Sequence, residues 1–445
     1  MSKVIAGMDW QELYSFASKQ ALLGLCFEGI ERLGKEYPEE LRLNPIGREL
    51  LMTWMGKAQQ IRRQNMKVNA VASKLFSMLR EDGLRCCILK GQGNALMYPN
   101  PYSRTPGDID VWIDASRERI MEYAQKKYEL GDDIRLQHLE TSLDGVPVEL
   151  HFFPCSMNNP IYHARLQKWF KRNADLQCSH IVGLPDGAGD IAIPTTAFNV
   201  VYQLTHLYHH FFDEGIGMRK IIDYFLVVND FSKNVFLDYD FSNHPVPLSK
   251  EGSTFSPSPS SSGSGDVTAP SRCSEPLRSK DGGASKPSPD CAGWDRRGVS
   301  GDTSSASCSS ASGSSITSVR SAFTTDSSAS TALVVVQREL KYLGLWKFAG
   351  AVMYVLKEVL GLAEDKMIVP MDEKRGRLLL AEILDGGNFG RHFTKYAGFT
   401  HQSMGKKYFL KIWRNMHFVR YYPAEALSEP IFRTWHFFWR VKNKK

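Results

Sequence analysis

The chain has 445 residues, which suits two or three domains because a single hydrophobic core seldom grows beyond about 250 to 300 residues. With 42% hydrophobic and 23% charged residues it has the composition of a globular protein, so it can bury a sizeable core. The net charge of +7 suits an anionic ligand such as a nucleotide or a nucleic acid, but it does not require one.

The sequence argues against a secreted, a membrane-spanning and a disulfide-bonded protein. The N-terminal residues carry charges where a signal peptide needs an apolar run. The most apolar stretch, residues 345–362, is interrupted by Lys347, Lys357 and Glu358, whereas a membrane span needs about 18 uncharged residues. The eight cysteines form no CxxC pair, which favours reduced core thiols over disulfides or zinc ligands. We expect a soluble, cytoplasmic protein with no membrane partner.

The first part of the chain is predicted to be helical. Residues 10–33 and 48–79 carry apolar side chains at three- and four-residue spacing, and Gly34 and Gly83 follow them as stop signals. We therefore assign residues 1–83 to an N-terminal helical region.

A strand, a glycine turn and a second strand follow. Residues 85–89 read as a buried strand, Gly91 and Gly93 bracket the turn, and Asp108 and Asp110 alternate with apolar residues at 109, 111 and 113. Alternation places both aspartates on one face of the strand and the apolar residues on the other. Two adjacent carboxylates repel each other unless a cation lies between them. Hard oxygen ligands select Mg²⁺ or Mn²⁺, so we predict a metal site here.

A hairpin supplies a third acid. A helix is expected at residues 115–128, with Ser116 or Asp114 as its cap. Two strand-like runs then flank Asp144-Gly145, a strong hairpin signal.

In the second arm of this hairpin Glu149 and His151 share one face, opposite the apolar residues 148, 150 and 152. A carboxylate on a buried strand is costly unless it is paired or bound to metal, so Glu149 is the natural partner of the two aspartates. The structural alternative is an ion pair with Arg104 or Arg135. Residues 84–194 form the predicted mixed α/β core.

Residues 195–249 return to a helical pattern. Two helical stretches at 195–228 are divided by Gly215 and Gly217, with three histidines (His206, His209 and His210) before the break. Arg219 and Asp223 follow it at a four-residue spacing, at which they can simply pair with each other. Zinc binding by the histidines is not favoured, because no fourth ligand or regular spacing accompanies them.

The composition changes abruptly near residue 250. Residues 250–331 are dominated by Ser, Gly, Pro, Thr and Ala, and such a segment buries too little apolar surface to offset its ordering entropy. We predict a disordered insertion there and a C-terminal helical region at 332–445, with helical patterns at 333–362, 374–384 and 408–418. The basic, aromatic-rich tail permits nucleic-acid binding, but core aromatics under a solvated basic face are the commoner reason for such a pattern.

The strand ending in Gly91-Gln92-Gly93, the Asp-x-Asp pair on the next strand and the later strand acid together resemble the polymerase-β-like nucleotidyltransferase superfamily. The fuller pattern, LKGQGNALMYPNPYSRTPGDIDVWID followed by VELHFFP and GIGMRKIIDYFLV, is similar to the bacterial uncharacterised nucleotidyltransferase family over about residues 60–230. The resemblance implies an α+β fold: a small mixed-sheet nucleotidyltransferase core between N-terminal and C-terminal helical regions. The Ser-rich insertion lies outside it.

The resemblance also implies roles for particular residues. Asp108, Asp110 and Glu149 would hold Mg²⁺ or Mn²⁺ and carry the catalysis, with an NTP as substrate and a small molecule, protein or RNA as the hydroxyl acceptor. Gly91, Gly93 and Asn94 would let the backbone and a helix start approach the triphosphate. Further nucleotide or substrate contacts are expected from residues of the intervening loop and the later helices: Lys90, Arg104, His210, Arg219 and Asp223.

One departure from the superfamily concerns Gln92. The superfamily more often has Gly-Ser or Gly-Gly at the turn, so the serine hydroxyl is missing here and the phosphate contacts fall to backbone N–H groups and to Arg104 or Lys90. This keeps open a catalytically silent member that only binds a nucleotide or a partner. An Asp-x-Asp glycosyltransferase is a weaker alternative, because it needs an α/β nucleotide-sugar domain before the motif.

Overall fold

The structure is a computed structural model that describes residues 2–128, 135–234, 325–388 and 404–443. All of these described residues belong to one compact unit. The predicted insertion at 250–331 lies outside the described residues except at its end, where a helix already begins at Thr325.

Helices precede the sheet, as the sequence predicts. They are α1 (Ser2–Ala6), α2 (Trp10–Lys19), α3 (Leu23–Glu36), α4 (Pro38–Leu43) and the long α5 (Arg48–Glu81). Gly83 ends α5 with a φ of +73°, but the expectation that Gly34 is a stop signal is wrong, because α3 runs through it. The break falls instead at Ala21, which adopts a φ of +57° between α2 and α3. No strand precedes β1 within residues 2–85, so the α/β domain that a glycosyltransferase needs before the motif is missing there.

The central sheet has four strands in the order β1-β2-β4-β3. They are β1 (Cys86–Leu89), β2 (Ile109–Ile113), β3 (His138–Leu143) and β4 (Val146–His151), and between them lie α6 (Gly91–Ala95), the 3₁₀ turn η1 (Pro101–Ser103) and α7 (Arg117–Lys127). β2 runs antiparallel to β1 and parallel to β4, and β3 and β4 form the predicted antiparallel hairpin. The mixed sheet confirms the predicted α+β fold.

Local sequence explains the connections of this core. Asp144 and Gly145 take φ values of +50° and +71°, the left-handed pair that a two-residue hairpin turn requires. Ser116 caps α7, accepting the backbone N–H of Arg119 at 3.3 Å.

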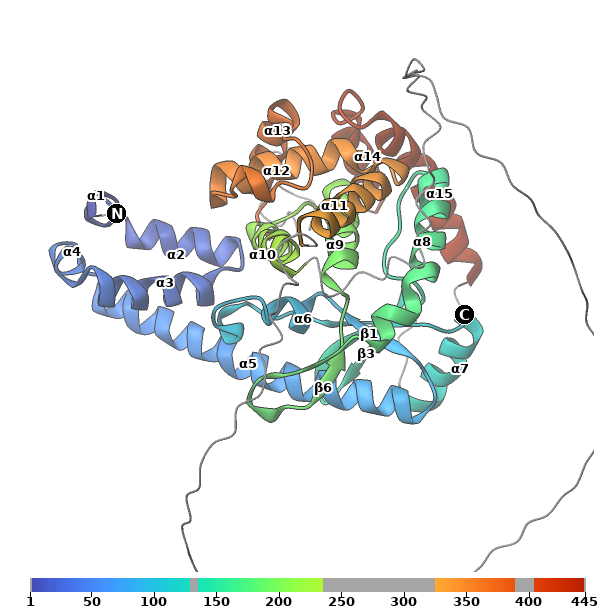
Figure 1. The fold of residues 1–445 in the computed structure, drawn as a ribbon, viewed down its shortest axis with the longest axis horizontal. Helices are drawn as coiled ribbons and strands as arrows, with labels where there is room; N and C mark the ends of the chain where they lie inside the picture. Colours follow the sequence, from blue (N-terminus) through green and yellow to red (C-terminus); the bar gives the residue numbers. More distant parts are fainter. Residues whose placement is uncertain (1, 129–134, 235–324, 389–403, 444–445) are drawn as a thin grey trace, which may run out of the picture. The chain divides into compact units, whose positions relative to one another are not determined.

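The sheet is covered on both faces (Figure 1). On one face Ile109, Val111 and Ile113 pack in a cluster with apolar residues of α5 such as Leu75 and Leu79. The opposite face carries Trp112, which stacks on Phe198 with ring centroids 6.2 Å apart. Because Asp108 and Asp110 alternate with the α5-facing residues, they lie on the Trp112 side.

The remaining elements build the second cover. They are α8 (Pro160–Ser179), a two-stranded sheet of β5 (Ile181–Gly183) and β6 (Asp190–Ala192) around the 3₁₀ turn η2 (Pro185–Gly187), α9 (Thr196–Asp213), α10 (Met218–Asn234), α11 (Thr325–Tyr342), α12 (Trp346–Leu360), the 3₁₀ turn η4 (Glu364–Lys366), α13 (Glu373–Gly386), α14 (Met404–Met416) and α15 (Pro423–Asn443). The pattern expected to continue through 333–362 is two helices, divided at Gly344, whose φ is +74°. None of the described helices has the length and apolarity to cross a membrane.

Candidate active site

Three carboxylates from two neighbouring strands meet on the face of the sheet that carries Trp112, opposite α5. Asp110 on β2 and Glu149 on β4 are partners in the parallel register, and Asp108 precedes β2 by one residue. One oxygen from each of the three lies within 4.8 Å of the others. The sequence-predicted set therefore converges, and the register of β2 against β4 is the feature that brings it together.

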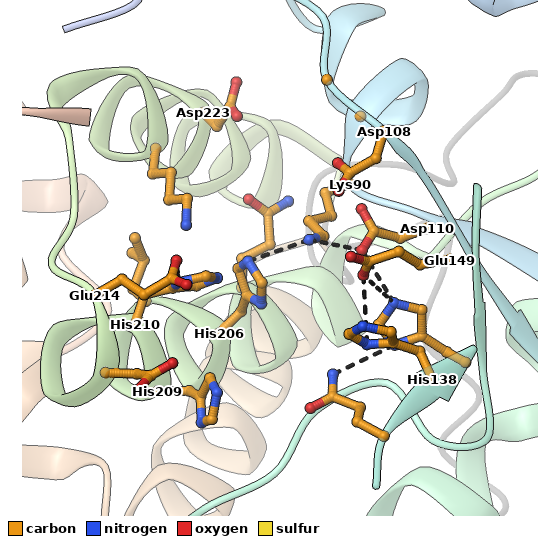
Figure 2. Close-up of a pocket in the computed structure, with 18 of the residues that line it drawn as sticks. Lys90, Asp108, Asp110, His138, Glu149, His206, His209, His210, Glu214 and Asp223 are labelled. Atoms are coloured by element: carbon orange, nitrogen blue, oxygen red, sulfur yellow. Dashed lines mark hydrogen bonds and ion pairs between the residues drawn. The ribbon is translucent and has the colours of Figure 1, made fainter. Parts of the chain in front are cut away.

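Two basic side chains balance this negative charge. Lys90 Nζ lies 2.9 Å from Asp110 Oδ1, and His151 Nε2 lies 3.1 Å from both Asp110 Oδ1 and Glu149 Oε2. Figure 2 shows Lys90 reaching Asp110 on one side and His206 on the other. These contacts lower the pKa values of Asp110 and Glu149 even though Asp110 is only 3% exposed.

The pKa values follow from these contacts. Burial opposes ionisation of Glu149, but the hydrogen bond and charge of His151 outweigh it and lower the Glu149 pKa to about 2. Burial likewise opposes protonation of His151, yet hydrogen bonds to Asp110 and Glu149 raise its pKa to about 9. Burial and the nearby His151 lower the pKa of His138 to about 4. At neutral pH Asp110 and Glu149 are therefore ionised, His151 is charged and His138 is neutral.

The glycine turn is built by backbone conformation and close packing. Lys90 and Gly91 have φ values of +47° and +46°, a region that side chains avoid. A Cβ at Gly93 would lie 3.0 Å from the Ile193 side chain, so a larger residue there would require Ile193 to shift. Gln92 is buried, and its amide donates to Asn69 of α5. The residue that departs from the superfamily thus anchors the turn to α5.

Asn94 joins the same turn to α9. Its amide and that of Gln203 exchange hydrogen bonds of 3.0 and 2.7 Å, and its side chain is 1% exposed. The backbone N–H groups of Gly93 and Asn94 both donate to the Lys90 carbonyl, at 3.0 and 3.4 Å. Asn94 therefore holds the turn in place beside the acids.

Arg104 is tied into the helical cover. Its guanidinium donates to both oxygens of Asp223 at 2.8 Å, and Tyr98 donates to the same carboxylate at 2.8 Å. Arg219, four residues before Asp223, does not pair with it by any hydrogen bond but donates to the Thr105 carbonyl at 3.0 Å. The i, i+4 pairing considered from sequence is thus replaced by a pair between the 101–108 loop and α10.

The structure does not show the alternative considered for Glu149, an ion pair with Arg104 or Arg135. Arg104 pairs with Asp223, and Arg135 lies 2.7 Å from Glu140 on the outer hairpin arm. The basic partner of Glu149 is His151. Sequence reasoning placed His151 on the same strand face without giving it a role, and it missed His138, which the hairpin register sets opposite His151.

A cavity of about 520 Å³ connects these groups. It is lined by the sequence-predicted residues Lys90, Gly91, Asn94, Arg104, Asp108, Asp110, Glu149, His210, Arg219 and Asp223, together with His138, His151, His206, Lys220 and others. Gly93 is not among the lining residues. His210 lies 3.6 Å from Glu214, and burial lowers the pKa of His210 well below its usual value. The sheet side of the cavity thus carries the three acids beside Lys90 and His151, and the helix side carries both acidic and basic groups.

Comparison with known proteins shows which family the chain belongs to. The sequence model of a family described as uncharacterised nucleotidyltransferase matches residues 6–242, while no curated protein matches the chain. Among solved structures, an antigenic nucleotidyltransferase-like protein from Paracoccidioides brasiliensis is 16% identical over 36% of this chain and 75% of its own, with a TM-score of 0.26. Since the family match spans more than half of the 445 residues, the chain belongs to the uncharacterised nucleotidyltransferase family.

Proposed function

We propose that the protein is a metal-dependent nucleotidyltransferase that moves a nucleoside monophosphate from an NTP to a hydroxyl acceptor and releases pyrophosphate. The observation that carries this proposal is the meeting of Asp108, Asp110 and Glu149 within 4.8 Å in a chain of this family. A nucleotide has room in the adjoining cavity of about 520 Å³.

The acids suit Mg²⁺ or Mn²⁺. Three carboxylate groups from a rigid sheet are the hard oxygen donors that these ions prefer, and Lys90 and His151 already supply positive charge at the same place. Asp108, Asp110 and Glu149 would hold the ion. When bound, it would neutralise phosphate oxygens and stabilise the charge that develops in phosphoryl transfer.

The chain's own residues would do the remaining work. Glu149 is ionised at neutral pH because of His151, so it would accept a hydrogen bond from an acceptor hydroxyl within reach, orient it and help to take its proton as the hydroxyl attacks. Gly91 allows a phosphate to approach the backbone, since no side chain shields the turn.

Cationic groups line the helical wall for the phosphates. Arg104 keeps one guanidinium nitrogen, Nη1, buried and without a hydrogen-bond partner among the described residues, and it lines the cavity with Arg219 and Lys90. A bidentate Arg104–Asp223 pair holds that guanidinium in a fixed direction. His210 and Asp223 would contact the nucleotide or the acceptor from α9 and α10.

The test is pyrophosphate release. Purified protein is incubated with each labelled NTP and Mg²⁺ or Mn²⁺, with and without RNA, and both pyrophosphate and the labelled acceptor are measured. We expect wild-type release and a loss of at least about 100-fold in Asp110→Asn, because an acid placed for charge stabilisation in the transition state is removed. Asp144→Asn is the matched control, since Asp144 lies on the same hairpin as Glu149 but pairs with Lys74 at the surface.

A silent binding module is the second candidate, and the presence of Gln92 at the turn is the observation that favours it. In that case NTPs would raise the melting temperature of the wild type while no metal or acceptor yields pyrophosphate. Equal release by wild type and Asp110→Asn would contradict the proposed site.

A further inference from the structure

Glu149 also belongs to a second cluster, which contains His138, a residue that the proposed reaction does not use. His138, Glu149 and His151 each present a ligand atom, and these atoms lie within 4.8 Å of one another. Both histidines come from the β3–β4 hairpin, where they are direct register partners. Figure 2 shows Glu149 between Asp110 and His138. The two clusters therefore share one carboxylate and extend in different directions from it.

The spacing of the ligand atoms fits a transition-metal ion. His138 Nδ1 lies 3.5 Å and His151 Nε2 lies 3.1 Å from Glu149 Oε2. A tetrahedral zinc ion with bonds of about 2.0 to 2.1 Å sets neighbouring ligand atoms about 3.3 Å apart. The two observed distances bracket that value, so each histidine lies at ligand spacing from Glu149, and the two histidine nitrogens lie within 4.8 Å of each other.

His138 gives independent support. It is 9% exposed, and neither of its ring nitrogens makes a hydrogen bond within the described part of the chain. Its nearest polar contacts are the carboxylates of Glu149 at 3.5 Å and Glu140 at 3.8 Å. A buried polar group without a hydrogen bond is costly, whereas a metal ion would satisfy its nitrogen.

The ligand types determine which ion fits. The cluster of Asp108, Asp110 and Glu149 offers oxygen alone, which suits Mg²⁺, whereas imidazole nitrogen suits zinc and its neighbours in the first transition row. Two imidazoles and one carboxylate also leave positions open for water or a substrate atom, as in zinc sites that are not purely structural.

We propose that His138, Glu149 and His151 form a second divalent-cation site that binds Zn²⁺ or a similar transition-metal ion in preference to Mg²⁺, with the ion displacing the ring proton of His151 to solvent. The site shares Glu149 with the proposed catalytic centre, but its existence does not depend on nucleotide transfer.

The test measures metal binding rather than turnover. Untagged, metal-free, full-length protein is titrated with Co²⁺ while its visible absorption is recorded, and Zn²⁺ and then Mg²⁺ are added as competitors. We expect one equivalent of Co²⁺ to give a ligand-field band that Zn²⁺ removes and excess Mg²⁺ does not. The X-ray absorption spectrum of the Zn²⁺-loaded wild type should show two imidazole ligands, a readout that needs no variant.

Three variants separate the two clusters. His138→Gln should weaken Zn²⁺ binding by roughly tenfold or more, since losing even a hydrogen-bond partner of a metal ligand costs that much. His417→Gln removes an exposed imidazole that does not line the cavity, and it should bind Zn²⁺ like the wild type. Asp108 lies outside the histidine cluster, so the variant Asp108→Asn should also keep wild-type Zn²⁺ affinity.

Two results would overturn the site: a Zn²⁺ spectrum with oxygen ligands only, or unchanged Zn²⁺ affinity in a folded His138→Gln. Neither result bears on pyrophosphate release with Mg²⁺, so failure of this site and failure of the proposed function are distinguishable.

Discussion

Asp108 and Asp223 line the same cavity but stand in different surroundings. Asp108 is exposed at the start of β2, whereas Asp223 is 4% exposed and accepts hydrogen bonds from Arg104 and Tyr98. Burial opposes ionisation of Asp223, but Arg104 outweighs it and lowers the Asp223 pKa. Among the described residues the Asp108 carboxylate is therefore free of such constraints, whereas the Asp223 carboxylate is held by Arg104 and Tyr98 and contributes to stability as well.

This contrast predicts that an aspartate-to-asparagine substitution changes the free energy of unfolding much more at position 223 than at position 108. Asp223→Asn should lower the free energy of unfolding by about 3 to 5 kcal/mol, because it leaves the buried Arg104 without its ionic partner. Asp108→Asn should change that free energy by no more than about 0.5 kcal/mol and still abolish pyrophosphate release. Urea unfolding of wild type and both variants measures the difference, and a variant pair of equal stability would contradict it.

At the level of single residues, the sequence predicts what lies on one strand better than what meets across the fold. Strand alternation alone sets Asp108 with Asp110, and Glu149 with His151. The Arg104–Asp223 pair joins positions 119 residues apart, and no local pattern reports such a contact. His138 was missed for a related reason, since its position opposite His151 depends on the exact hairpin register.

Among the helices, α15 is attached to α8 through a buried carboxylate. Glu425 is 1% exposed and accepts the backbone N–H groups of Asn158 at 2.5 Å and Asn159 at 3.2 Å. Asn159 is the N-cap of α8, so Glu425 accepts backbone N–H groups at the start of α8 that have no partner within the helix. Burial is the largest influence on Glu425 and raises its pKa from 4.5 to about 7.

The raised pKa predicts a pH-dependent docking of α15. A carboxyl group whose pKa is higher in the folded protein stabilises the fold fully below pH 4.5, and that contribution is lost as the pH rises through 7. A glutamine side chain in place of Glu425 would mimic the protonated acid at every pH. We therefore expect Glu425→Gln to match the wild type near pH 5 and to be more stable by roughly 2 to 3 kcal/mol near pH 8.

Urea unfolding of the two proteins at both pH values measures this difference, because the comparison cancels every other titrating group. A stability difference that is the same at pH 5 and pH 8 would show that Glu425 stays ionised, held by the two N–H groups of α8.

The elements themselves were predicted unevenly. The Asp144-Gly145 turn and the period-two strands gave the hairpin, because both signals are local. The break between α2 and α3 was missed because it uses Ala21 with a positive φ, a conformation that the residue type does not announce. The prediction that Gly34 ends a helix was wrong because a glycine inside a helix costs only about 1 kcal/mol, which packing can outweigh.

Over the whole molecule, helices on both sides of the Ser-rich segment share one core. Phe231 of α10 and Ala332 of α11 belong to the same hydrophobic cluster, which extends from Ile5 to Ala426. α14 lies beyond the residues matched by the family model, yet it contributes Lys411 and Arg414 to the cavity wall. Burial therefore joins helices from both sides of the Ser-rich segment in one helical cover.

This shared core predicts the effect of removing the Ser-rich segment. Deleting residues 252–319 keeps α10, α11 and every residue of the cavity wall, while residues 235–251 and 320–324 still connect the two helices. The deleted part has few of the large apolar residues that a core needs, so the deletion should leave the melting temperature and the rate of pyrophosphate release nearly unchanged.

Calorimetry and the pyrophosphate assay on the shortened and full-length proteins measure both quantities. Deleting residues 345–388 instead is the contrasting control, because it removes α12 and α13, whose side chains Phe348, Val352 and Ile383 are fully buried; it should abolish soluble folded protein. Loss of soluble protein in the 252–319 deletion as well would mean that this segment takes part in the fold despite its composition.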